Sequence, residues 1–317
     1  MKIAIRRAIG EKIIELAKDD KNIVIVTSDA RGSAAISEFF EIFPERSIEV
    51  GIAEQSAVGV AAGLALSGKK PFVFGPACFY SARSLEQIKN DVAYTNANVK
   101  IVAVSGGVSY GPLGSTHHSL HDIAVMRSIS NLHVILPSDA IEAIALLEKL
   151  LSDSTPTYMR VGRNPVLVFH DQDEQKKIFE IGKAINLKKG NDLSIIATGE
   201  IVWNVMEASK MLENEGIEAR VIELHTVKPL DEEEVYKAAK ETGLIVTVEE
   251  HNIFGGLGGA IAEFVSQNIP VPVKILGIPD EYPVTGKQEE VLKHYGLDSK
   301  GIFVTVKNWF RKMRGGF

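Results

Sequence analysis

The chain has 317 residues, of which 45% are hydrophobic and 24% charged, as in ordinary globular proteins. Its formal net charge of −6 does not support binding to nucleic acid or to an anionic membrane, and no run approaches the roughly 18 uncharged apolar residues of a membrane span. The single cysteine, Cys78, excludes an internal disulfide and a cysteine-based metal cluster, and a reducing, cytoplasmic compartment is expected.

The first half of the chain alternates helical patterns with short β-branched runs. The patterns predict helices at Ile3–Lys18, Glu54–Ser67, Ala82–Tyr94 and Asp139–Leu151. Strands are predicted at Ile23–Thr27, Ser47–Val50, Pro71–Phe74, Val99–Ser105, His133–Leu136 and Thr157–Arg160. This alternation is typical of a parallel sheet covered by helices on both faces.

A polar run, D-Q-D-E-Q-K-K at 171–177, interrupts the alternation and predicts a surface linker over 166–184. Beyond it, strands are predicted at Leu193–Thr198, Ala219–Leu224, Leu244–Glu249 and Val271–Ile275. The matching helices are Ile201–Glu215, Asp231–Glu241, Gly258–Gln267 and Gln288–Tyr295. We therefore predict an α/β protein with two domains, 1–165 and 185–317, each with a parallel or mixed sheet and helices on both faces.

Ligands of open α/β sheets bind beyond the carboxyl ends of the strands. Four loops of the first domain qualify: Ser28–Ser33, Gly51–Glu54, Gly75–Ser81 and Ser105–Asp122. Glu54 begins a small, apolar, helix-forming run that extends to Ala62. A partly desolvated carboxylate there can exchange a proton with a bound ring nitrogen near neutral pH. The alternative is an acidic residue favoured in a first helical turn by the helix dipole.

Two other patterns are excluded by their context. G-V-S-Y-G at 107–111 matches a hydrolase nucleophile elbow, but a loop follows it where that motif needs a helix. His117, His118 and His121 lack an intervening glutamate and a third distant ligand, so we predict no metal ligands in this chain. A histidine-rich loop that lines a cleft and moves protons is the better interpretation.

Several motifs occur in an order and spacing that resemble the C-terminal half of transketolase, the thiamine-diphosphate enzyme, over nearly the whole chain. They are R-R-A at 6–8, T-S-D-A-R-G-S at 27–33, G-I-A-E-Q at 51–55, S-A-R-S-L-E-Q-I-K at 81–89, G-S-T-H-H at 114–118, R-V-G-R at 160–163, H-T-V-K-P-L-D at 225–231 and E-E-H-N-I-F-G-G-L-G at 249–258. The resemblance implies a pyrimidine-binding domain followed by a transketolase C-terminal domain.

The G-D-G motif, which in this family holds the cofactor diphosphate and its metal, is absent from the sequence. The resemblance therefore implies a split enzyme, in which a second chain carries the diphosphate-binding domain and most of the Mg²⁺ coordination. A fragment of a longer enzyme remains the alternative. An assembly with two copies of each chain is expected.

The resemblance also implies roles for individual residues. Glu54 would bind the aminopyrimidine ring, His117 would line the substrate channel and act in catalysis, and Asp29 would lie near the thiazolium ring. Arg6, Ser33 and Arg163 would bind the phosphate of a sugar phosphate, for which the planar donor fork of arginine is well suited. Surface positions for the two arginines and a turn for Asp29 are the alternatives.

Three positions depart from the family pattern. Pro76 stands where a stacking aromatic is expected, and Phe74 and Phe79 are the candidates to replace it, with core packing as the alternative. Leu113 replaces an acidic residue, and Ser105 replaces a histidine, which removes two polar contacts to a sugar. A site that lacks hydrogen-bond partners for the hydroxyl groups of a sugar discriminates poorly between sugars that differ in those groups. We therefore expect an unusual ketose donor.

Two alternative functions remain open. The β subunit of a 2-oxo acid dehydrogenase first component shares the fold, the cofactor and the split architecture, and deoxyxylulose-phosphate synthase is a further relative. A non-catalytic regulatory subunit that kept the fold is the alternative of another class, and the intact Glu54 counts against it.

Overall fold

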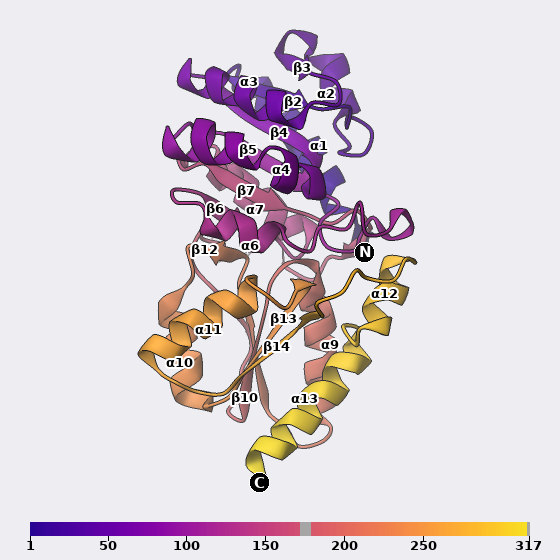
Figure 1. Cartoon of the computed structure of the whole chain (residues 1–317), viewed down its shortest axis with the longest axis vertical. Helices are drawn as coiled ribbons and strands as arrows, with labels where there is room; N and C mark the ends of the chain where they lie inside the picture. Colours follow the sequence, from indigo (N-terminus) through magenta and orange to yellow (C-terminus); the bar gives the residue numbers. More distant parts are fainter. Residues whose placement is uncertain (172–178, 316–317) are drawn as a thin grey trace.

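The computed structural model describes residues 1–171 and 179–315, and each half of the chain builds an open sheet with helices around it (Figure 1). The first sheet has seven strands in the order β12 (Thr226–Lys228), β6 (His133–Ile135), β7 (Thr157–Arg160), β5 (Lys100–Val104), β4 (Lys70–Pro76), β2 (Ile23–Thr27) and β3 (Ser47–Glu49). All neighbouring pairs are parallel except β12 with β6.

The second sheet has five strands, and only its edge strand β9 runs antiparallel to its neighbour. Its order is β14 (Val273–Ile278), β13 (Ile245–Asn252), β10 (Leu193–Ala197), β11 (Ala219–Glu223) and β9 (Ile185–Lys188). A small antiparallel pair joins β1 (Lys2–Ile3) to β8 (Val166–Leu167). The predicted α/β class with parallel and mixed sheets is thus confirmed.

Alternating side chains of the first sheet pack into two separate hydrophobic clusters. Ile25, Phe72 and Val102 face α1 (Ile5–Asp19), α2 (Ser37–Ile42) and α7 (Ala140–Leu150). Their sequence neighbours Val26, Val73 and Ile101 face α3 (Glu54–Leu66), η2 (Ile88–Tyr94) and α6 (Asp122–Ser128). Both faces of these strands are therefore buried, which explains why their sequences are continuous apolar runs.

The second sheet is covered in the same way. One face packs against α9 (Val202–Glu213), α12 (Gln288–His294) and α13 (Ser299–Arg314), and the other against α10 (Glu232–Thr242) and α11 (Leu257–Asn268). The second face shares one continuous cluster of buried residues with the first domain. The two halves consequently have a common core across their junction.

All ten predicted strands are present, with ends shifted by a few residues, and the structure corrects the prediction at several elements. The helix expected at Ala82–Tyr94 is three pieces: α4 (Ala77–Arg83), α5 (Leu85–Gln87) and the π-helical η2. The sequence pattern does not predict α13, α2, α6 or the short strands β1, β8, β9 and β12, which are present in the structure. Most of the polar run at 171–177 lies outside the described residues.

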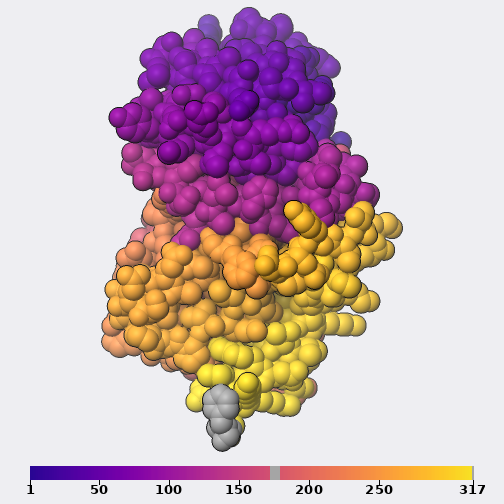
Figure 2. Space-filling model, in the orientation of Figure 1, coloured from indigo at the N-terminus to yellow at the C-terminus, as the bar shows by residue number. Residues whose placement is uncertain are grey.

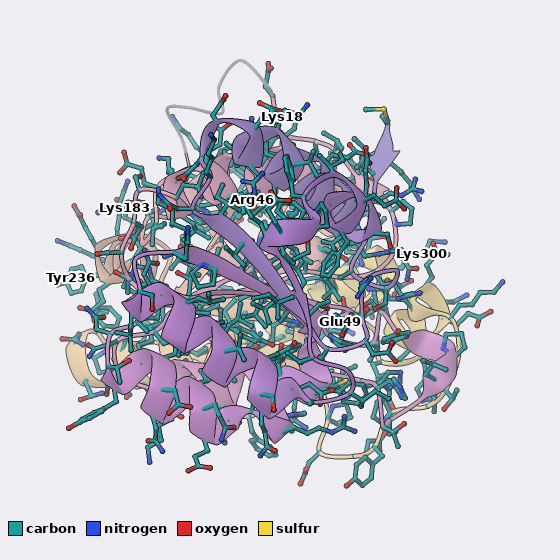
Figure 3. The ribbon with its side chains drawn as sticks, turned by 90° about the horizontal axis from the view of Figure 1, so that it is seen from above. Lys18, Arg46, Glu49, Lys183, Tyr236 and Lys300 are labelled. Carbon is teal, nitrogen blue, oxygen red and sulfur yellow. The ribbon has the colours of Figure 1, made fainter. Side chains whose placement is uncertain are left out.

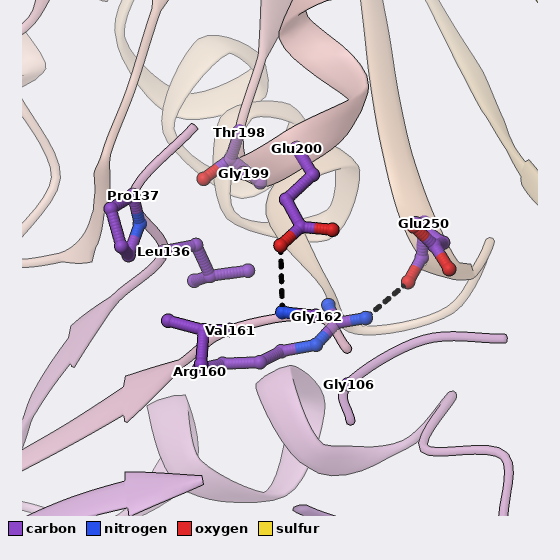
Figure 4. A pocket seen from close by; sticks show the side chains of 10 residues that line it. All are labelled: Gly106, Leu136, Pro137, Arg160, Val161, Gly162, Thr198, Gly199, Glu200 and Glu250. Atoms are coloured by element: carbon purple, nitrogen blue, oxygen red, sulfur yellow. Dashed lines mark hydrogen bonds between the residues drawn. The ribbon is translucent and has the colours of Figure 1, made fainter. Parts of the chain in front are cut away.

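The junction between the halves contains buried charged groups around a small cavity (Figure 4). Arg160 donates a hydrogen bond from Nη2 to the backbone carbonyl of Glu250 over 2.7 Å. The backbone N–H of Gly162 donates to Oε1 of Glu200 over 2.9 Å. Residues from both domains therefore bond directly across the junction.

Among the described residues, no helix combines the length and the apolar character needed to cross a membrane.

Candidate active site

The four loops chosen from the sequence follow the carboxyl ends of β2, β3, β4 and β5, which are neighbours in the sheet. Because these strands are parallel and in register, their ends lie along one edge. In Figure 3, the label Arg46 marks the residue before β3 and the label Glu49 the last residue of that strand. The sheet thus brings loops that are distant in sequence to one side of the domain.

Glu54 is the first residue of α3 and is only 4% exposed. Its Oε1 accepts a hydrogen bond from Nη1 of Arg83 over 3.0 Å, and the Arg83 side chain is half exposed. The helix start places the carboxylate beside the free N–H groups of the first turn, where negative charge is favoured. The site therefore holds a sheltered carboxylate whose cationic partner extends toward solvent.

A row of aromatic rings leads away from this pair. The guanidinium of Arg83 lies over the ring of Phe79, 4.2 Å from the centroid. Phe79 contacts the ring of His117 edge-on at 5.2 Å, and His117 contacts Tyr110 in the same manner at 5.3 Å. His117 also lies within 2.9 Å of the Thr116 hydroxyl through Nδ1. The structure thus brings Glu54, Phe79 and His117 together at one edge of the sheet.

The row ends at two arginines. The guanidinium of Arg163 lies over Tyr110, 4.6 Å from the ring centroid. Arg6 donates from Nε to the carbonyl of Arg163 over 3.1 Å and from Nη1 to the carbonyl of Ser33 over 2.9 Å. Three of the predicted substrate residues, Arg6, Ser33 and Arg163, are therefore in one cluster.

This cluster carries positive charge without a carboxylate partner among the described residues. Burial and then the charge of Arg163 lower the pKa of Arg6. Nη1 of Arg163 is buried and makes no hydrogen bond to a described residue. A buried donor without an acceptor is costly, so the cluster is suited to an anion that accepts from both guanidiniums.

Asp29 lies on the loop after β2, exposed, with a positive φ of 53°. Its backbone N–H donates to Oε1 of Glu49 over 2.7 Å, and the same carboxylate accepts from the N–H of Gly51 and pairs with Arg31. Strained backbone conformations persist where surrounding contacts enforce them, often at functional sites. Glu49 therefore fixes the two loops that carry Asp29 and Glu54.

The positions that depart from the family pattern differ in their exposure. Phe74 is fully buried in the core of the first domain, so it offers no ring face to a ligand and Phe79 is the remaining aromatic candidate. Ser105 is also fully buried, has a φ of 62°, and its hydroxyl makes no hydrogen bond to a described residue. Leu113 is 50% exposed in the 3-10 turn η3 (Gly111–Leu113).

The second domain supports the loop that carries His117. Figure 2 shows the second half, in orange and yellow, directly against the magenta loop region of the first. A Cβ on Gly111 would lie only 2.4 Å from the carbonyl oxygen of Gly286, and Asn164 donates to Gln288 over 2.8 Å. The close approach requires glycine at position 111. It holds the loop that carries His117 against the second domain.

Sequence reasoning missed three residues of this arrangement: Arg83, Tyr110 and Glu49. Arg83 lies inside the S-A-R-S-L-E-Q-I-K motif, so the motif was a signal that this residue has a role in the site as well as in a helix. Tyr110 and Glu49 give no comparable signal. Their positions depend on the paths of the loops, which no local pattern determines.

Comparison with known proteins identifies the family of this chain. Residues 1–166 match the model of the transketolase pyrimidine-binding domain, and residues 182–302 match that of the transketolase C-terminal domain. The chain is 52% identical over 310 residues to an apulose-4-phosphate transketolase subunit of Phocaeicola vulgatus, covering 98% of each protein. It is 37% identical over 290 residues to a 6-deoxy-6-sulfo-D-fructose transketolase subunit of Clostridium sp., covering 92% of this chain and 89% of the relative.

Among solved structures, a split-gene transketolase described as an inactive beta4 tetramer superimposes with a TM-score of 0.87 at 38% identity, covering 97% of this chain and 98% of that one. A transketolase from Campylobacter jejuni shares the fold with a TM-score of 0.83 at 18% identity, and this chain spans 47% of its length. Both domain models, the similarity over full length and the shared fold agree, and the chain belongs to the transketolase family.

Proposed function

We propose that this chain is the C-terminal subunit of a two-chain, thiamine-diphosphate-dependent transketolase. In this proposal it transfers a two-carbon ketol unit from a ketose phosphate to an aldose acceptor. The observation that carries the proposal is the sheltered carboxylate of Glu54, which lies at the carboxyl edge of the sheet beside Phe79 and His117. Arg83 and the helix start offset part of the cost of burying this acid, and its place beside the aromatic row supports a binding role.

The residues around Glu54 fit the aminopyrimidine of the cofactor. Oε1 and Oε2 of Glu54 supply a carboxylate for a ring nitrogen, and the half-buried Phe79 supplies an aromatic surface nearby. When bound, thiamine diphosphate supplies a carbon nucleophile and an electron sink for cleaving the bond next to a ketose carbonyl. Glu54 would hold or share a proton at the ring nitrogen, and Arg83 would keep its carboxylate oriented.

The remaining site residues would bind the substrate. His117 would donate a hydrogen bond to a ketose hydroxyl, and its contacts with Phe79 and Tyr110 fix the plane of its ring. Arg6 and Arg163 would bind the phosphate through their clustered guanidiniums. Asp29 would lie toward the second cofactor ring. These roles derive from the geometry of this chain together with its family.

A second chain is part of the proposal, because the sequence contains no G-D-G motif for the diphosphate and its divalent metal. The 52% identical relative carries the name of one subunit of a transketolase, and the split-gene structure is described as an inactive beta4 tetramer. We expect two copies of each chain in the active assembly.

The donor is proposed to be an unusual ketose phosphate. Leu113 presents an apolar, half-exposed side chain on the His117 loop, and Ser105 is fully buried. The site then has fewer polar groups that can hydrogen-bond to the hydroxyl groups of the donor. Apulose 4-phosphate, the substrate in the name of the 52% identical relative, is the first donor to test.

The test combines this chain with a diphosphate-binding subunit and measures turnover of ketose phosphates. The Glu54→Gln variant is expected to lose roughly 100-fold or more in kcat, because the carboxylate can no longer exchange a proton. Glu86→Gln, at an exposed glutamate on α5, serves as the matched control. Circular dichroism and gel filtration establish that both variants remain folded and assembled.

Unchanged turnover in Glu54→Gln would contradict the assigned role. A folded assembly without ketose turnover in the native protein would instead favour a regulatory subunit, and decarboxylation of 2-oxo acids would favour the dehydrogenase alternative. In the same assay, a preference for xylulose 5-phosphate over apulose 4-phosphate would refute the proposed donor while leaving the transketolase activity intact.

A further inference from the structure

A cluster of carboxylates and imidazoles lies at the junction of the two domains, away from the candidate active site. It is formed by Glu142 of α7, His170 in the segment after β8, and Glu223 at the end of β11. One ligand atom from each of the three lies within 4.8 Å of the others. Because the three residues come from separate parts of the chain, no sequence motif indicates that they lie together.

Both carboxylates of the cluster are completely buried. The side chains of Glu142 and Glu223 are 0% exposed, and that of His170 is 8% exposed. Burying an ionised carboxylate is unfavourable unless it is neutralised or bound by a cation. Two such groups so close together require positive charge beside them, which the neighbouring His170 and His225 supply when protonated and to which a bound cation would add.

The contacts in the cluster are short, and besides its approach to Glu223, Nε2 of His170 makes a 3.3 Å hydrogen bond with the Ser138 hydroxyl. Nε2 of His170 lies 2.9 Å from Oε2 of Glu223, yet neither oxygen of Glu223 accepts a hydrogen bond of normal geometry from any described residue. Donor atoms that share one metal ion at about 2.1 Å lie about 3–3.5 Å from each other, with lone pairs that converge on the ion. The 2.9 Å separation of His170 and Glu223 and the unpartnered Glu223 oxygens are compatible with that arrangement, and all three ligand atoms lie within 4.8 Å of one another.

Neighbouring groups hold the ligands in place. Oε2 of Glu142 accepts hydrogen bonds from the backbone N–H and the hydroxyl of Ser138, at 2.7 and 2.9 Å. Oε1 of Glu142 lies 3.0 Å from Nδ1 of His225, whose Nε2 donates to the carbonyl of Glu180. The ring of His170 packs between Phe169 and Phe179, with centroids at 4.4 and 4.9 Å. Such supporting contacts orient metal ligands in known sites.

We propose that Glu142, His170 and Glu223 bind one divalent transition-metal ion, with Zn²⁺ as the ion of choice, at the domain junction. One imidazole and two carboxylates form a ligand set that suits this class of ion, and the site is too poor in oxygen ligands for Ca²⁺. The ion links α7 of the first domain to β11 of the second through its ligands. Its role is structural and separate from the metal that accompanies the cofactor.

The experiment titrates Zn²⁺ into the full chain after treatment with a chelator, in the absence of cofactor and partner, and follows heat by calorimetry. One equivalent is expected to bind and to raise the Tm by several degrees, because the ion binds only the folded chain. His170→Gln and Glu223→Gln are each expected to weaken binding by at least about 100-fold and to remove the rise in Tm.

Two control variants distinguish this site from others that bind Zn²⁺. Glu200→Gln changes another carboxylate at the domain junction, and His121→Gln changes an exposed histidine of the active-site loop. Neither should alter the affinity. Titration of the native chain with Co²⁺ gives a second measurement, since visible absorption bands report the coordination of the ion even if a variant fails to fold.

Absence of binding in the native chain would overturn the proposal and leave two buried pairs of histidine and glutamate at the junction. Equal Zn²⁺ affinity in a folded His170→Gln variant would also overturn it. Loss of binding in His121→Gln would assign the ion to the active-site loop instead and refute the site at the junction.

Discussion

Two guanidiniums lie together at the predicted phosphate position, and each lacks an anionic partner among the described residues. Arg6→Ala is expected to raise the KM for a ketose phosphate by about 10- to 100-fold, which corresponds to one charge-assisted hydrogen bond. The kcat should change much less, because the phosphate is remote from the reacting carbon. Steady-state kinetics with the assembled enzyme measures both values.

Arg7→Ala provides the matched control, since Arg7 is the exposed neighbour of Arg6 on the same helix. A donor without phosphate should give the same KM in all three proteins. An equal rise in KM for both kinds of donor would show that Arg6 only supports the fold. Partial recovery in Arg6→Lys would support a charge interaction with phosphate.

Individual residues of the candidate site were predictable only in part. The order of motifs indicated Glu54, His117, Arg6 and Arg163, and the structure brings these four to one edge of the sheet. Phe74 is fully buried, because helices cover both faces of β4, so Phe79 is the candidate ring that remains accessible. The sequence pattern of a strand buried on both faces does not tell which of its side chains a ligand can reach.

At the scale of elements, Asp139 joins a helix to the segment between the domains. Its Oδ1 caps α7 by accepting from the N–H groups of Ile141 and Glu142, and its Oδ2 accepts from those of Phe169 and His170. The side chain is fully buried. Asp139→Ala is therefore expected to lower the free energy of unfolding by about 3 kcal/mol or more, measured by urea titration with a chelator present.

Asp298→Ala is the control for this prediction. Asp298 caps α13 with one hydrogen bond, from the N–H of Gly301, and lies near the surface. Its loss should cost about 1 kcal/mol, as for an ordinary helix cap. Equal losses in the two variants would show that the two bonds from Asp139 to the interdomain segment contribute nothing.

Elements were predictable where their pattern is local. The strands of both sheets are apolar runs bounded by turns, and all ten predicted ones exist. α13 was missed because only Ile302 and Val306 are fully buried in it, and most of its other apolar side chains are only partly covered where the helix packs against α9. β12 has three residues and forms only because β6 offers it a free edge. Such elements arise from tertiary contacts that a local pattern does not encode.

At the scale of the whole molecule, the charged junction makes stability depend on pH. Burial and then the charge of Glu250 raise the pKa of Glu200 to about 8, from an ordinary value of 4.5. Between these values the folded chain keeps a proton that the unfolded chain has released. The stabilisation is complete below pH 4.5 and is lost as the pH rises to 8, since ionisation favours unfolding there.

Glu200→Gln keeps an acceptor for the N–H of Gly162 and cannot ionise. We expect it to raise the free energy of unfolding at about pH 8.5 by on the order of 2 kcal/mol and to have a smaller effect at about pH 5.5. Urea titrations at both pH values measure the difference, with Glu218→Gln at an exposed position as control. A variant with the native pH dependence would contradict this account of the junction.

The strand β12 belongs by sequence to the second half of the chain and by pairing to the sheet of the first. A fragment cut between the two family domains would leave β6 as an unpaired edge strand. Other chains could pair with this edge, which would favour aggregation. Chimaeras that exchange halves between relatives must therefore carry a matching β6 and β12 from one parent. The strand β12 thus makes the sheet of the first domain depend on the second half of the chain.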